Sequence, residues 1–201
     1  MSKKVIFKDA QGNSLYPRCA VTNSIPEGAF LAISVCDSAI TVSSTTATTI
    51  TTGTWHQYGL MAREGKSIMK ITVPRGEKWS ILFRTNATRF SLTSVSGSTK
   101  WAGVGTVRLS GDGTGEQEWY DFGMAYETSG GNDNLGAYTE TVVELTAGTY
   151  YFGVYAVKNN TSGNPVAQGG ATHERPVTNT SYWANGHSII QIAQLVNKES
   201  V

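Results

Sequence analysis

The stretch YTETVVELTAGTYYFGVYAVK, residues 138–158, carries the clearest indication of the fold. Thr, Val and Tyr dominate its two arms, and residues of these types favour extended backbone. The arms, 138–145 and 149–158, alternate with a period of two and are separated by a Thr-Ala-Gly turn. We therefore expect two antiparallel strands joined as a β-hairpin.

In the second arm, both faces of the expected strand are apolar or aromatic. One face carries Tyr150, Phe152, Val154 and Ala156, and the other carries Tyr151, Gly153, Tyr155 and Val157. A sheet with one face in water normally shows polar residues on that face. Burial of both faces follows if one meets the core and the other meets a neighbouring subunit, although a covering loop would have the same effect. The pattern favours an oligomer.

Similar alternation recurs along the rest of the chain. Further strands are expected at 4–8, 28–36, 67–73, 78–85, 89–96, 101–110, 118–127 and 188–196. Gly-rich turns separate many of them at intervals of about 8 to 12 residues, and no segment sustains a helical period. These features predict an all-β fold, a β-sandwich of the jelly-roll type.

The segment TVSSTTATTITTGT, residues 41–54, consists almost entirely of Ser and Thr. Thr has a restricted side-chain torsion and prefers extended backbone, unlike the Gly and Ser of flexible linkers. We interpret this segment as a semi-rigid neck. It would divide the chain into an N-terminal segment, residues 1–40, and a β-sandwich head, residues 55–201.

Composition excludes several classes of function. With 201 residues and a net charge of +1, the chain lacks the clustered positive charge that nucleic-acid binding requires. No apolar run reaches the roughly 20 residues of a membrane span. The start MSKKVIFKDA lacks the long apolar stretch of a signal peptide, so we expect synthesis in a cytoplasm without membrane insertion. Cys19 and Cys36 are expected to be free, buried thiols, and a disulfide between them is the alternative.

The N-terminal stretch VIFKDAQGNSLYP, residues 5–17, resembles the start of small structural proteins of tailed bacteriophages, particularly phages of gut Bacteroidales. The residues that carry the resemblance are Val5, Phe7, Lys8, Asp9, Gly12, Asn13, Leu15, Tyr16 and Pro17. The match covers about 20 of the 201 residues. It implies that this segment attaches the chain to other virion proteins, of the capsid or the tail. It also implies a homotrimer, because fibres of this class are usually threefold, and a location in the virion.

Catalytic and metal-binding motifs are absent from the sequence. His56, His173 and His187 are far apart, and we expect no cofactor, no metal and no enzymatic activity. The stretch GDGTGEQEWYD contains four carboxylates, Asp112, Glu116, Glu118 and Asp121. Paired carboxylates can hydrolyse glycosides or bind calcium, but a solvated turn explains this cluster more simply.

The stretch NTSYWANGH, residues 179–187, is the candidate ligand site. It belongs to a long irregular segment, and such loops often carry function. Tyr182, Trp183, Asn185 and His187 combine aromatic rings with hydrogen-bonding groups, which suits binding of a glycan. The alternative is a loop whose tryptophan fills an interface between subunits.

These observations favour a structural virion protein, a short homotrimeric fibre that serves as a head fibre, capsid decoration or tail appendage. Its head would adsorb to glycans of the host surface through several weak sites at once. Two alternatives stay open. One is a monomeric carbohydrate-binding sandwich, and the other is a polysaccharide-degrading enzyme that uses the carboxylates between Asp112 and Asp121.

Overall fold

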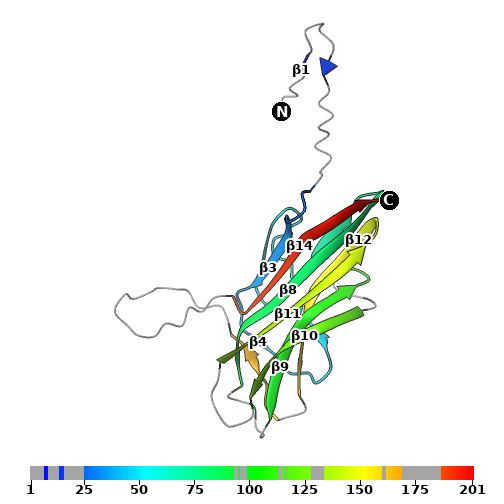
Figure 1. Cartoon of the computed structure of the whole chain (residues 1–201). Helices are drawn as coiled ribbons and strands as arrows, with labels where there is room; N and C mark the ends of the chain where they lie inside the picture. The colour runs from blue at the N-terminus through cyan, green and yellow to red at the C-terminus, as the bar shows by residue number, and fades with distance from the viewer. Residues whose placement is uncertain are drawn as a thin grey trace.

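The computed structural model in Figure 1 describes residues 7–8, 14–15, 25–92, 95, 99–112, 115, 117–127, 134–159, 162–168 and 187–201. Its regular elements are β1 (Phe7–Lys8), β2 (Ser14–Leu15), β3 (Phe30–Cys36), β4 (Ile40–Thr41), β5 (Thr48–Thr49), β6 (Trp55–Tyr58), β7 (Met69–Val73), β8 (Glu77–Ser91), β9 (Lys100–Leu109), β10 (Gln117–Glu127), β11 (Asn134–Leu145), β12 (Gly148–Lys158), β13 (Val166–Ala167) and β14 (Ile189–Ser200). All are strands, as the sequence predicts.

Two antiparallel sheets form a jelly-roll sandwich, which confirms the predicted fold class. In the first, which we call the β8 sheet, β8 pairs with β11 on one side and with β14 and then β13 on the other. β14 pairs with β3, β3 with β6, and β13 with β4. In the second, the β12 sheet, β9 lies between β10 and β12, and the other edge of β12 pairs with β7 and β5. Figure 1 shows β3, β14, β8 and β11 side by side in one layer.

The predicted hairpin at residues 138–158 is wrong, although both of its strands exist. β11 pairs with β8, whereas β12 pairs with β9 and β7 in the opposite sheet. The turn therefore carries the chain across the sandwich. Val143 and Leu145 of β11 lie in the same buried cluster as Phe152 of β12, so the two arms meet through side chains in the core.

The Ser/Thr-rich segment 41–54 belongs to the sandwich, in contrast to the neck we expected. The Val42 amide donates to the carbonyl of Pro165 at 2.8 Å, and the Ile50 amide to the carbonyl of Val154 at 2.8 Å. Both side chains are buried in the core. β3 likewise places part of the expected N-terminal segment in the β8 sheet. Thr favours extended backbone, and here that backbone finds its partners within the same chain.

β1 and β2 form a separate two-stranded antiparallel sheet, in which Phe7 is paired with Leu15 and Lys8 with Ser14. The other residues assigned to virion attachment, Val5, Asp9, Gly12, Asn13, Tyr16 and Pro17, lie outside the described residues.

Two buried apolar clusters fill the space between the large sheets, and a polar layer separates them. Phe83 and Ala193 belong to one cluster, while Ala87 and Ile189 belong to the other. Between these positions, the amide of Gln191 donates to the Gly153 carbonyl at 3.0 Å and to the hydroxyl of Thr106 at 3.1 Å. The hydroxyls of Thr106 and Thr85 are 2.9 Å apart. Gln191 in the β8 sheet is thus bonded to two strands of the β12 sheet.

Replacing Gln191 with Ala should lower the free energy of unfolding by about 2–4 kcal/mol, because it removes these bonds and leaves a cavity. Urea denaturation followed by circular dichroism measures the change. The exposed Gln117 provides the matched control, and Gln117→Ala should cost at most about 0.5 kcal/mol. Equal losses in the two variants would show that the buried amide contributes nothing specific.

The two sheets meet closely where β10 passes β11. A Cβ atom placed on Gly123 would lie 2.0 Å from the backbone oxygen of Tyr138. The Thr139 hydroxyl also donates to the Asp121 carbonyl at 3.3 Å. Only a residue without a side chain allows these two backbones to approach so closely.

Gly123→Ala should therefore destabilise the protein by about 3 kcal/mol, because the backbone of β11 would have to move away. Gly136→Ala is the control, since its added Cβ would meet backbone oxygens at an ordinary 3.6 Å. That variant should stay within about 0.5 kcal/mol of the original chain. Thermal melts of both variants measure the difference in stability. A melting temperature of Gly123→Ala equal to that of the original chain would contradict the close contact.

Candidate functional site

The outer face of the β8 sheet combines apolar and polar side chains. Along β14, Gln191, Ala193 and Leu195 are buried, while Ile190 and Ile192 point to the other face and are partly exposed. The pairing register places Val35 and Ile33 of β3 beside them on one side, and Asn86 and Arg84 of β8 on the other. We call this surface the β8 face and define it by Phe30, Ile33, Tyr58, Leu82, Val142, Ile190 and Ile192.

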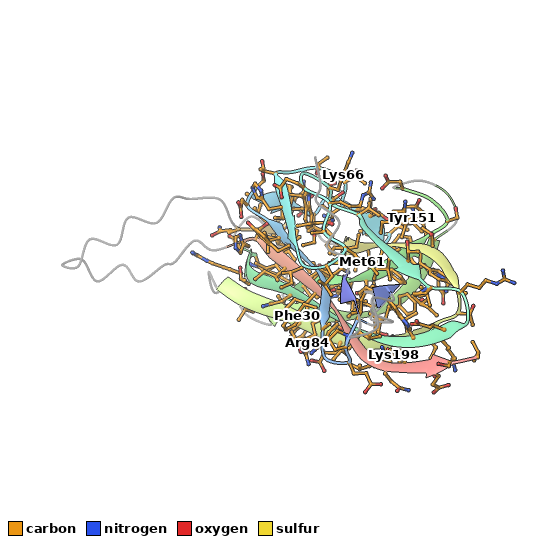
Figure 2. All side chains as sticks on the ribbon, turned by 90° about the horizontal axis from the view of Figure 1, so that it is seen from above. Phe30, Met61, Lys66, Arg84, Tyr151 and Lys198 are labelled. Carbon is orange, nitrogen blue, oxygen red and sulfur yellow. The ribbon has the colours of Figure 1, made fainter. Side chains whose placement is uncertain are left out.

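A polar group lies within the β8 face. The Arg84 Nε atom donates to Glu140 Oε1 at 2.8 Å, and its Nη1 atom donates to Gln194 Oε1 at 3.1 Å. The Tyr138 hydroxyl also donates to Glu140. This hydrogen bond, followed by the one from Arg84, lowers the pKa of Glu140. Figure 2 shows Arg84, Phe30 and Lys198 on one side of the sandwich and Lys66 and Tyr151 on the other.

Aromatic rings cover part of the outer face of the β12 sheet. Phe122 stacks on Trp101 with ring centroids 5.7 Å apart, and Trp119 meets Tyr155 edge to face at 5.0 Å. The rings lie over glycines, because a Cβ on Gly105 would be 2.5 Å from the ring of Tyr155. We call the exposed part, Trp101, Trp119, Phe122, Met124 and Tyr126, the aromatic strip.

The outward residues of β12 itself are covered by the same chain. Tyr155 and Val157 are buried in a cluster with Ile68, Val107 and Leu109, against which Ala47 also packs. Burial raises the pKa of Tyr155 to about 12, with a smaller effect from the charge of Asp121. Side chains of the same chain, such as Ala47 and Ile68, therefore cover the outward face of β12. The apolar character of both faces of β12 does not require a neighbouring subunit.

Of the residues predicted to bind a glycan, only His187 belongs to the described structure. Its Nδ1 atom pairs with Asp37, whose other carboxylate oxygen lies 3.3 Å from His56 Nε2. His56 Nδ1 in turn lies 2.6 Å from Glu64 Oε1. Tyr182, Trp183 and Asn185 lie outside the described residues. The pairing of β3 with β6 and β14 brings the two histidines together, and their spacing in the sequence gave no indication of it.

The acidic stretch 111–121 does not form a pair of facing carboxylates in the part of the chain that is described. Asp112 accepts two hydrogen bonds from Arg63, at 3.0 and 2.6 Å, and Glu118 pairs with Arg108. The hydrogen bond from Arg63 lowers the pKa of Asp112. Glu116 lies outside the described residues.

Among the described residues, no group of three or more His, Cys, Asp or Glu side chains is arranged to hold a metal ion. None of their segments forms a helix with the length and apolar character of a membrane span. Cys36 is a free, buried thiol as expected, and burial raises its pKa. Cys19 falls outside the described part.

No protein-family model matches the sequence, and a comparison with curated proteins finds no match. Among solved structures, the chain is similar to murine APRIL at pH 8.5, with 12% identity, a TM-score of 0.40, and coverage of 83% of this chain and 99% of that one. It is also similar to Eiger TNF from S. frugiperda, with 12% identity, a TM-score of 0.43, and coverage of 86% and 96%. At these values the likeness concerns the arrangement of the strands alone.

Proposed function

We propose that the chain is a structural, non-enzymatic protein of a tailed-phage virion, a short homotrimeric fibre that serves as a head fibre, capsid decoration or tail appendage. The N-terminal segment attaches to other virion proteins, and the sandwich faces outward and adsorbs to host glycans. The observation that carries the assembly is the β8 face, on which Phe30, Tyr58 and Val142 are exposed to water. The net charge of the chain is only +1, so electrostatic repulsion between identical copies is weak.

The β8 face offers what a subunit interface needs. Its apolar side chains provide surface that a partner can bury, and the bonded group of Arg84, Glu140 and Gln194 among them provides fixed polar contacts. Exposed ion pairs of this kind contribute little to the stability of a single chain. They gain importance when a partner excludes water from them.

The aromatic strip supplies a second, different apolar surface on the opposite sheet. Met124 and Tyr126 are each 48% exposed there. When two unlike surfaces of one chain bind each other, the subunits form a ring if the rotation between them closes. We propose that the β8 face of one subunit binds the aromatic strip of the next and that three subunits close the ring.

One observation favours a different function. Exposed aromatic rings on the face of a sandwich can also stack on sugar rings, and the aromatic strip would serve this purpose in a single chain. A monomeric carbohydrate-binding sandwich is therefore the second candidate. The oligomeric state separates the two.

The full chain should elute from a size-exclusion column with a light-scattering mass near three times 21.6 kDa. Ile190→Glu should reduce the mass to that of one chain, because it places a charge on the β8 face beside Val35. Thr72→Glu, at an exposed position of β7, should leave the mass unchanged. A monomeric original chain would overturn the trimer and leave the carbohydrate-binding sandwich.

Virion location calls for a separate experiment. In purified particles of the phage that encodes the chain, mass spectrometry should detect it at many copies per particle. Tyr16→Ala combined with Leu15→Ala should remove the chain from the particles while its trimeric mass persists, because the attachment segment is distinct from the β8 face. Particles that lack the original chain would contradict the virion assignment.

A further inference from the structure

We propose that the core of the sandwich binds an internal water molecule between the Ser34 hydroxyl of β3 and the side-chain oxygen of Gln191 in β14. This binding site lies inside the chain and is independent of the proposed virion function. Both residues are completely buried. The Ser34 Oγ and Gln191 Oε1 atoms have no hydrogen-bond partner among the residues that the structure describes.

The two unpartnered atoms belong to a row of polar side chains that crosses the inner face of the β8 sheet. The register pairs Ser34 with Gln57 of β6 on one side and with Gln191 on the other. Gln191 is paired in turn with Thr85 of β8. All four residues are buried. Side chains paired directly across two strands project from the same face of the sheet. Ser34 and Gln191 are therefore neighbours inside the sandwich.

The orientation of the Gln191 amide follows from its other hydrogen bonds. Its nitrogen donates to the Gly153 carbonyl at 3.0 Å and to the Thr106 hydroxyl at 3.1 Å. A carbonyl only accepts hydrogen bonds, so the amide nitrogen, and not the oxygen, must face Gly153. The Oε1 atom is therefore not satisfied by turning the amide over. Buried polar atoms of folded proteins are nearly always bonded, either to the protein or to water.

Water has the chemistry that the two atoms require. Oε1 needs a donor, and the Ser34 hydroxyl can donate or accept. Because neither atom has a partner, they are not within hydrogen-bond distance of each other. Water is the smallest molecule that can bond to both. The residues in the row are neutral, so an ion would lose its hydration there without gaining an opposite charge.

The size of the neighbouring side chains suits a guest as small as water. Ala32, Ser34 and Cys36 are successive inward residues of β3, and the first and last of them belong to the two apolar clusters. All three have short side chains, so β3 contributes less volume to the core at Ser34 than β14 contributes at Gln191. Internal waters of proteins typically occupy such positions and bond to groups that would otherwise be unpartnered.

The first test is a high-resolution crystal structure of the full chain. We expect a separate peak of electron density within about 3 Å of both Ser34 Oγ and Gln191 Oε1. A direct bond between these two atoms, or no density at this position, would overturn the proposal. This measurement uses the original chain, so it decides the question even if a core variant fails to fold.

A pair of variants tests the site in solution. Magnetic relaxation dispersion of the water oxygen counts water molecules that stay inside the protein for long times. Ser34→Val should lower this count by about one, because valine takes up space and offers no hydrogen bond. Ser188→Ala is the matched control, since Ser188 is also completely buried but its hydroxyl already donates to the Cys36 carbonyl at 3.0 Å. An unchanged count in Ser34→Val, or an equal loss in both variants, would refute the site.

Discussion

The bond from the Gln191 amide to strands β9 and β12 is the constraint on which the sandwich depends. It joins the middle strand of one sheet to the other sheet at a point between two apolar clusters. The Nε2 group of Gln191 finds acceptors in both sheets, at Thr85, Thr106 and Gly153, whereas its buried Oε1 atom has no hydrogen-bond partner among the described residues. Because side chains alternate along a strand, an inward Gln191 also requires Ile190 and Ile192 to face outward. The same bond that aligns the core therefore sets the position of the β8 face.

The sequence was sufficient to predict the positions of most strands, because period-two alternation and β-branched residues act locally. It was not sufficient to predict which strands pair. The arms 138–145 and 149–158 satisfy every local rule for a hairpin, yet they lie in opposite sheets. The extended character of residues 41–54 was correct, but their partners, such as Val154 and Pro165, are far away in the sequence. Pairing over such distances is decided by the whole core.

Prediction of the site was less successful, for a related reason. The alternation of β12 was correctly interpreted as burial on both faces, but a segment of the same chain covers it. The stretch SIIQIAQLV contained the stronger signal, since an apolar row remains on its outward face in the structure. The contact of His56 and His187 with Asp37 likewise depends on pairings that no spacing rule reveals.

The pairing of β14 has a consequence for how the protein is made. β14 lies between β3 and β8, so the β8 sheet lacks its middle strand until residues 189–200 have left the ribosome. Until then, β3 and β8 each have one edge without its partner strand, the edge that pairs with β14. Folding must therefore follow synthesis of this strand, at the slow rate typical of non-local β-sheets. The outer face of this sheet is therefore complete only once residues 189–200 have joined β3 and β8.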